Sequence, residues 1–455
     1  MVIHPSDSVE VRADGHKYAR CAIRCGEDVI KYGMPIGHAT CDIAPGEHVH
    51  VHNLATNLGE VLEYTYDPDP GLLATSPEAP KPSGPVPTIK AYRHPDGRVG
   101  IRNDIWIIPT VGCVNRLCER LAATCGGLAL THPYGCSQLG ADHETTANLL
   151  AALACHPNAG GVLVVALGCE NNTLESFRAR VPEGINIRFL RAQDPGDEFE
   201  RGTALIAELL ANRPTTREEV PVSELVVGLK CGGSDGFSGL TANPLVGRFS
   251  DWLVARGGST VLTEVPEMFG AETLLMKRCR TRAVFDRCVA MVNDFKAYYA
   301  RHSQVCYENP SPGNKAGGIS TLEDKSLGCV QKGGLSPVED VLCYGERVRG
   351  HGLSLLSGPG NDLVASTVLA AAGCHLILFT TGRGTPFGTV VPTLKIATNS
   401  TLAEAKPHWI DWDAMANPDV ESFAKKVLAV ADGALARNES MGDRGIAIFK
   451  DGVTL

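Results

Sequence analysis

The chain has 455 residues and a formal net charge of −9, with 44% hydrophobic and 20% charged residues. Its length predicts two or three domains. The acidic balance argues against a nucleic-acid or membrane-surface partner, because either would need a basic patch. The N-terminal stretch lacks the apolar run of a secretory signal, and the most apolar stretches are too short to cross a bilayer. We therefore expect a cytoplasmic protein whose 16 cysteines are mostly reduced thiols.

The N-terminal residues 1–66 alternate short apolar runs with Gly and Pro turns, which is typical of a small all-β domain. Within it, "GEHVHVHN" places His48, His50 and His52 at every second position. A strand would put these three imidazoles on one face. Neutral imidazole is a common metal ligand, and His16 lies in the same domain. The triplet therefore predicts either a metal-binding face or an exposed polar strand.

The rest of the chain differs in composition and in hydrophobic pattern. Residues 67–88 are rich in Pro, Ser, Gly and Ala, which predicts an extended linker. From residue 89, short apolar runs such as "DIWIIPTVGC" and "HLILFTTGRG" alternate with amphipathic stretches. This pattern predicts α/β units built on parallel strands with crossover helices. A break near residues 212–221 separates a first α/β domain, residues 89–215, from a second, residues 216–455.

Ligands of open parallel sheets bind beyond the carboxyl ends of the strands. Several apolar runs end there in cysteines, carboxylates or amides, and the cysteines are Cys113, Cys136, Cys169 and Cys231. A single cysteine at such a place is usually a small buried hydrophobic residue. Their repetition therefore carries more weight than any one of them. Glu264, Glu267 and Asp362 follow other runs. The Gly-rich stretches fit neither the dinucleotide nor the phosphate-loop fingerprint.

Long stretches of the sequence resemble the altronate/galactarate dehydratase family of sugar-acid dehydratases. Residues 15–53, "GHKYARCAIRCGEDVIKYGMPIGHATCDIAPGEHVHVHN", resemble its SAF domain, which is a β-clip module. "THPYGCSQLGADHE", "LKCGGSDGFSGLTANPLVG" and "TGRGTPFGTVVPTLKIATN" resemble its C-terminal body. The resemblance implies an all-β SAF domain followed by two α/β units with mainly parallel sheets. It covers nearly the whole chain.

The resemblance also implies a reaction, the metal-dependent dehydration of an altronate-type hexonate to a 2-keto-3-deoxy acid. Galactarate is the alternative substrate. A sulfo-lyase is a further alternative, because sulfolactate sulfo-lyases share both modules. A sugar-acid binding protein is the alternative outside enzymes. The partner is then a small sugar acid, and we expect a homo-oligomer.

The implied metal is ferrous iron, with manganese as a second choice. We expect it to be held by His16, His50 and His52, with Cys136 as a further ligand. A second arrangement stays open, in which strand-end cysteines hold iron as thiolates or in an iron–sulfur cluster. A metal would supply Lewis acidity for the enediolate and for the departing 3-hydroxyl.

The reaction also needs a base that removes the proton alpha to the carboxylate. Lysine is a usual base in such chemistry, and desolvation lowers a lysine pKa. We therefore expect Lys230, with Asp235 as its partner, or Lys315 to be the base. Substrate binding needs a guanidinium for the carboxylate and polar groups for the hydroxyls. The residues expected there are Arg383, Asn243, Asn314, Asn361 and Thr385.

Overall fold

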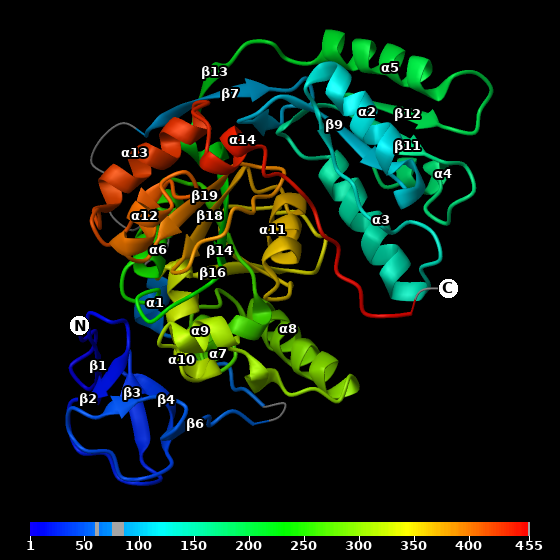
Figure 1. Ribbon diagram of the computed structural model, residues 1–455. Coiled ribbons are helices and arrows are strands. Elements are labelled where there is room, and N and C mark those ends of the chain that lie inside the picture. Colours follow the sequence, from blue (N-terminus) through cyan, green and yellow to red (C-terminus); the bar gives the residue numbers. More distant parts are fainter. Residues whose placement is uncertain (60–62, 75–85, 454–455) are drawn as a thin grey trace.

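The computed structural model describes residues 1–59, 63–74 and 86–453. Figure 1 shows a small all-β region at the N-terminus beside an α/β body that contains two parallel sheets. This arrangement confirms the predicted fold class. Among the described residues, no helix combines the length and apolar character needed to cross a bilayer.

The N-terminal region consists of two three-stranded antiparallel sheets, in the orders β1-β2-β5 and β3-β4-β6. Their strands are β1 (Val9–Val11), β2 (Lys17–Ala19), β3 (Asp28–Lys31), β4 (Met34–Ala39), β5 (His48–Val49) and β6 (Leu54–Ala55). Alternate residues such as Val9, Val11 and Val29 point into the core and are buried. The expected strand through the histidine triplet is wrong in length. It ends at Val49, and residues 50–53 form a turn.

The segment that follows lies against the body. Leu58, Tyr64 and Tyr66 pack on the core of the second α/β unit. Within the expected linker, α1 (Pro70–Ala74) is a short helix rather than an extended chain. Asp69 explains it, because its carboxylate accepts backbone N–H groups of the first turn. The expected linker residues 75–85 lie outside the described residues.

The first α/β unit is a four-stranded parallel sheet in the order β10-β9-β11-β12. Every residue of β11 is buried, as expected for a strand covered on both faces. Its strands are β9 (Asp104–Pro109), β10 (Leu128–Ala129), β11 (Ala159–Ala166) and β12 (Ile187–Arg191). Its helices are η1 (Gly112–Val114), α2 (Asn115–Cys125), α3 (Gly140–Ala154), α4 (Leu174–Arg178) and α5 (Glu198–Asn212). Helices α2 and α5 cover one face, and α3 packs on the other.

The second α/β unit is a seven-stranded sheet in the order β16-β17-β15-β14-β18-β19-β20, with every pair parallel. Its strands are β14 (Val226–Cys231), β15 (Ser259–Leu262), β16 (Val338–Leu342), β17 (Gly352–Leu356), β18 (Leu376–Thr381), β19 (Thr393–Ala397) and β20 (Trp412–Asp413). Its α-helices are α6 (Ala242–Val254), α7 (Glu272–Met276), α8 (Arg282–Arg301), α9 (Pro312–Ala316), α10 (Leu322–Cys329), α11 (Asp362–Ala371), α12 (Ser400–Ala405), α13 (Val420–Ala431) and α14 (Arg437–Met441). Short 3-10 helices are η2 (Val222–Glu224), η3 (Val265–Glu267), η4 (Cys306–Glu308) and η5 (Val330–Gly333).

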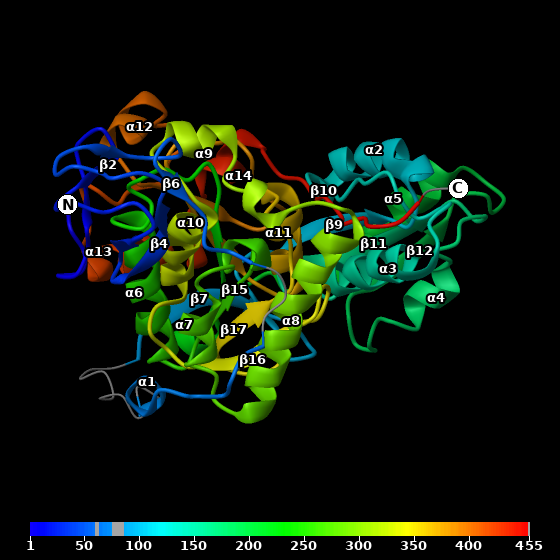
Figure 2. The ribbon, with the colours of Figure 1, turned by 90° about the horizontal axis from the view of Figure 1, so that it is seen from below.

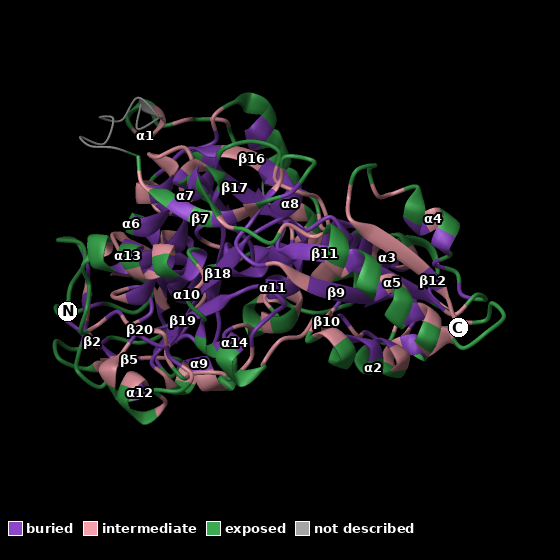
Figure 3. Ribbon diagram, turned by 90° about the horizontal axis from the view of Figure 1, so that it is seen from above, coloured by how far each residue is buried: buried purple, intermediate pink, exposed green. Residues whose placement is uncertain are grey.

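The two units share structure at two places. Strands β7 (Thr88–Arg93), β8 (Val99–Gly100) and β13 (Glu218–Pro221) form an antiparallel sheet that brings both ends of the first unit together. Helix α3 packs on α11, so these helices form a common layer between the two parallel sheets (Figure 2). Figure 3 shows the strands at the buried centre, with exposed residues on the outer helices.

Candidate active site

A cavity of about 520 Å³ opens at the carboxyl ends of β14, β15 and β17 in the second unit. Its walls come from the loops after these strands and from helices α8, α9 and α10. Phe449, from the C-terminal segment, closes one side. The polar lining residues are Cys231, Glu267, Asn309, Ser311, Asn314, Lys325, Asn361 and Asp362, with Phe295, Tyr298 and Tyr299 on α8.

A buried group that we call the lysine–thiol cluster forms part of the cavity wall and extends behind it. It consists of Lys230, Cys231, Glu264, Glu267, Lys325, Cys329 and Lys332. The Nζ atom of Lys325 lies 2.7 Å from Oε1 of Glu267. The Nζ atom of Lys332 lies 2.9 Å from Sγ of Cys231 and 3.1 Å from Oε2 of Glu264. Charges buried this deeply must be paired, and these contacts pair them.

Lys230 links the cluster to the cavity wall. Its ammonium donates to Glu264 and lies 2.9 Å from Oδ1 of Asp362. Burial lowers the pKa of Lys230, but Glu264, Asp362 and Glu267 outweigh burial and raise the pKa above its usual value. Lys230 is therefore a charged group that holds carboxylates. The expected lowering of its pKa is wrong.

Three atoms of the cluster converge on one point. The two sulfur atoms of Cys231 and Cys329 are 3.2 Å apart, and each lies 3.2 Å from Oε2 of Glu267. Within residues 1–59, 63–74 and 86–453, this is the one group of at least three His, Cys, Asp or Glu side chains whose ligand atoms are close enough to share a metal ion. Two thiols and a carboxylate suit iron and other metals of intermediate softness.

The charges of the cluster also suit a divalent ion. Burial raises the pKa of Glu267, but Lys325, Lys230 and Lys332 outweigh burial and lower it to about 2. Three ammonium groups then face the carboxylates of Glu264, Glu267 and Asp362. A divalent ion that replaces the protons of the Cys231 and Cys329 thiols would bring two positive charges and leave two negative thiolates. The net charge of the cluster would therefore stay the same. The residues present therefore fit the metal that the sequence resemblance implies.

The backbone at Glu264 is held in an uncommon conformation. Its φ of 72° lies in the left-handed region, although it is not glycine. Such a residue costs about 1–3 kcal/mol and persists where the surroundings fix it. Here Oε2 of Glu264 accepts the backbone N–H of Cys231 at 3.0 Å. The strained residue therefore sets the position of the cluster's first thiol.

Asp235 is not the partner of Lys230. Its carboxylate accepts hydrogen bonds from Ser238, Thr398 and Asn399. Burial raises its pKa, in spite of these donors. The predicted pairing failed because Lys230 lies on β14, whereas Asp235 lies in the loop beyond the end of that strand. The contacts of Asp235 hold the loop after β14 against the loop after β19.

Two of the three expected asparagines line the cavity. Asn314 donates to the carbonyl of Ser234 at 2.8 Å and completes the N-terminal cap of α9. Asn361 caps α11 through its side-chain oxygen. Asn243 is fully buried, and its amide bonds a carbonyl of α10 and a hydroxyl of β18. Asn243 therefore joins elements of the fold.

Three other expected residues do not line the cavity, namely Arg383, Thr385 and Lys315. Arg383 is exposed and donates at 3.2 Å to the carbonyl of Gly313, at the start of α9. The hydroxyl of Thr385 accepts the backbone N–H of Phe387. Lys315 lies on α9 and is half-buried.

The histidines gather although their strand is short. The ring of His48 lies 5.1–5.5 Å from those of His16, His50 and His52, measured between centroids. The closest nitrogens, Nδ1 of His16 and Nε2 of His48, are 3.1 Å apart. Nε2 of His50 donates to the carbonyl of Lys315 at 2.9 Å. The histidine group thus contacts α9, the helix that also lines the cavity.

Cys136 belongs to a different unit from these histidines. It is exposed, on the loop that leads to α3 in the first α/β unit. Its neighbour Ser137 donates its backbone N–H to Asn171, in the loop after β11. The structure therefore groups Cys136 with the other strand-end cysteines of the first unit.

Sequence reasoning missed Lys325, Cys329 and Lys332. They lie on α10 and η5, which follow no strand, so a search of strand ends passes over them. The signal was "GCVQK", in which Cys329 and Lys332 are three residues apart and share one side of a helical turn.

Three family models match the chain in succession. They are described as the altronate/galactarate dehydratase SAF domain (residues 2–57), the second domain of D-galactarate dehydratase/altronate hydrolase (residues 91–213) and the D-galactarate/altronate dehydratase C-terminal domain (residues 222–454). Together they cover nearly all of the chain.

Curated relatives match over similar lengths. The chain is 54% identical to an altronate dehydratase of Bacillus subtilis, over 98% of this chain and 94% of that protein. It is 51% identical to an altronate dehydratase of Escherichia coli, over 99% and 94%. It is 33% identical to the galactarate dehydratase (L-threo-forming) of Escherichia coli, over 89% and 80%. The chain belongs to the altronate/galactarate dehydratase family.

Proposed function

We propose that this chain is a hydro-lyase that dehydrates an altronate-type hexonate to a 2-keto-3-deoxy acid. The observation that carries the proposal is the sequence identity of 51–54% to two altronate dehydratases, which extends over nearly the full length of this chain and of each relative. The cavity beside the lysine–thiol cluster supports it, because it offers both charge and hydrogen-bonding groups to a polyhydroxylated acid.

In this proposal Asp362 is the base that removes the alpha proton. It lines the cavity, and its side chain is 34% exposed, so it can reach a bound substrate. Lys230, 2.9 Å away, keeps this carboxylate oriented without entering the cavity. Lys315, the other base expected from the sequence, is the second candidate because α9 borders the same cavity.

We assign the metal to Cys231, Cys329 and Glu267, with ferrous iron as the first choice and manganese as the second. When bound, such an ion supplies Lewis acidity to the carboxylate and the 3-hydroxyl of the substrate. The second ligand set is the one expected from the sequence, His16, His50 and His52. It has in its favour that these rings gather beside α9.

Substrate recognition falls to the remaining lining groups. Lys325 provides a cation for the substrate carboxylate, and Asn314 and Asn361 offer amides to its hydroxyls. Arg383 lies next to Gly313 at the start of α9, and we assign it to the mouth of the cavity as an additional anion contact. We also propose a cytoplasmic location, because all 16 cysteines are free thiols.

The test is a dehydration assay of the purified protein, loaded anaerobically with ferrous iron. Altronate, galactarate and sulfolactate are supplied in turn, and formation of the 2-keto acid or release of sulfite is followed. We expect altronate to be turned over with the highest kcat/KM. Preference for galactarate would correct the substrate, and sulfite release would replace the hydro-lyase proposal. No turnover of any of the three would contradict it.

A further inference from the structure

Three exposed cysteines lie at one edge of the parallel sheet in the first α/β unit. Cys113 follows β9, Cys136 follows β10, and Cys169 follows β11, and a glycine precedes each of them. All three side chains are exposed, whereas free cysteine is among the most buried residue types. Because the carboxyl ends of parallel strands meet at one edge, the three thiols belong to one surface region.

Direct contacts hold the three cysteine loops together. The backbone N–H of Gly112 donates to the carbonyl of Tyr134 at 2.9 Å, which joins the first loop to the second. The N–H of Asn172 donates to the carbonyl of Gly135 at 3.2 Å, which joins the third loop to the second. Gly135 has a φ of 103°, and a Cβ there would lie 1.9 Å from the carbonyl oxygen of Thr110. The close packing therefore requires glycine before Cys136.

Some buried polar groups on these loops have no partner in the described part of the chain. Nε2 of Gln138 and Oδ1 of Asn172 make no hydrogen bond to any described residue, and their residues are 2% and 0% exposed. Oδ1 of Asn115, beside Cys113, is also without a partner. Ser137, next to Cys136, has a φ of 62°. Unsatisfied buried groups and backbone strain gather where a bound group completes a site.

We propose that Cys113, Cys136 and Cys169 bind an iron–sulfur cluster through their thiolates. Iron–sulfur clusters are held by cysteine thiolates, and these three loops supply three of them. A single ion requires its ligand atoms to lie close together, and among the described residues only the Cys231 group does so. A cluster places its irons apart and so suits thiols that are spread over three loops. This inference does not depend on the proposed function.

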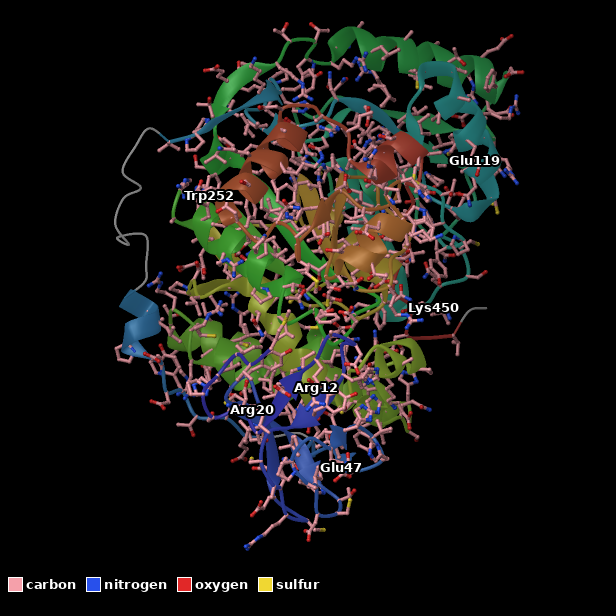
Figure 4. The ribbon with its side chains drawn as sticks, turned by 60° about the vertical axis from the view of Figure 1, so that its left-hand side comes forward. Arg12, Arg20, Glu47, Glu119, Trp252 and Lys450 are labelled. Atoms are coloured by element: carbon pink, nitrogen blue, oxygen red, sulfur yellow. The ribbon has the colours of Figure 1, made fainter. Side chains whose placement is uncertain are left out.

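The position of this site connects it to the cavity. Asp142, in the first turn of α3, accepts the backbone N–H groups of Asp451 and Gly452 at 2.9 and 2.7 Å. Phe449, which lines the cavity, is two residues before Asp451 and so lies within about 7 Å of it along the chain. Figure 4 shows Lys450 on this segment. The cysteine loops and the cavity therefore border the same C-terminal segment.

The test is anaerobic reconstitution of the full chain with ferrous iron and sulfide. Iron and acid-labile sulfide are measured per chain, together with visible absorbance. We expect several of each per chain and a charge-transfer band at about 400 nm. Cys136→Ser and Cys169→Ser should each lose the band and most of the sulfide.

Two control variants locate the site. Cys41→Ser removes an exposed thiol of the N-terminal region and should reconstitute like the parent. Cys329→Ser removes a thiol of the lysine–thiol cluster and should keep the band. Loss of the band in Cys329→Ser with retention in Cys136→Ser would overturn the assignment. Iron binding without sulfide would overturn the cluster. If the reconstituted parent dehydrates altronate but shows no absorbance band at about 400 nm, this inference alone is contradicted and the proposed function still stands.

Discussion

At the scale of the residue, Lys230 shows how neighbours decide what burial does. Desolvation by itself would favour a neutral amine. The side chain is fully buried, yet two carboxylates contact its ammonium and keep it charged. A charged lysine is a poor proton acceptor, and it is a strong positioning group for the carboxylates around it.

Replacement of Lys230 tests this role. Lys230→Met keeps the length of the side chain but removes its charge, and it leaves Asp362 without its cation. We expect kcat to fall by roughly 100-fold or more, with a smaller change in KM, since general base catalysis typically contributes 10²–10⁴-fold and Asp362 depends on this contact for its position. Lys230→Arg should recover part of kcat. A Lys230→Met enzyme with parental kcat would show that Asp362 does not depend on this contact.

At the scale of the element, His375 connects β14 to β8. Its Nε2 donates to the carbonyl of Val99 at 2.7 Å, and its Nδ1 accepts the N–H of Val226 at 3.0 Å. Only the neutral ring makes both bonds. Burial lowers the pKa of His375 from 6.5 to about 4, in spite of its acceptor at Val99.

This shift predicts how stability changes with pH. Between the unfolded pKa of 6.5 and the folded pKa of about 4, the unfolded chain binds more protons than the folded one. The contribution of His375 is therefore complete above pH 6.5 and is lost as the pH falls toward 4. Its size is about 3 kcal/mol. Denaturant unfolding at several pH values should show the full loss in the parent and in exposed His351→Gln. The loss should be smaller by about 3 kcal/mol in His375→Gln, because the lowered pKa values of the buried His156 and His132 still contribute there. Equal slopes in all three would contradict the assignment.

A second element-scale contact docks the N-terminal region on the body. Asp324, on α10, accepts from Lys17 at 2.7 Å and from Lys31 at 2.8 Å, and all three side chains are buried. Burial raises the pKa of Asp324, but the two ammonium groups outweigh burial and hold the pKa below its usual range. In Figure 4 the labelled Arg12, Arg20 and Glu47 belong to this docked region.

Asp324→Asn should weaken the docking strongly. It leaves two lysines buried without a counter-charge, which costs about 3–5 kcal/mol. We expect calorimetry to show a lower Tm and a separate early transition. Asp42→Asn, at an exposed position of the same region, serves as the control. An unchanged Tm in Asp324→Asn would mean that the docking does not rest on this triad.

The sequence predicted elements better than it predicted contacts. Continuous apolar runs such as β11 and β18 indicate buried parallel strands because they are eight and six residues long, whereas buried helices are usually longer. The histidine triplet was found by its spacing, although a turn and not a strand brings His50 and His52 beside His48. The lysine–thiol cluster was only half visible, because Lys325, Cys329 and Lys332 meet β14 through tertiary packing. Spacing along the chain does not record such packing.

At the scale of the whole molecule, the N-terminal region contacts α9 and α10, two helices that line the cavity of the body. Leu58, Tyr64 and Tyr66 pack on the body, so a deletion should end at Asn57 and not at residue 66. We expect a chain that lacks residues 1–57 to keep its far-UV circular dichroism and to lose turnover, because α9 and α10 lose the contacts of His50 and Lys17. Addition of the separate region should restore part of the rate. Full turnover by the deleted chain would show that the region is dispensable.

The central claim is that the cavity beside the lysine–thiol cluster is where the sugar acid loses water. The most direct measurement compares the dehydration of altronate by the iron-loaded parent and by Glu267→Gln. This carboxylate lines the cavity and contacts both thiols, and glutamine keeps its shape. We predict turnover by the parent and a loss of at least about 100-fold in kcat, with lower bound iron, in the variant. Parental kcat and iron content in a folded Glu267→Gln enzyme would place the chemistry elsewhere in the molecule.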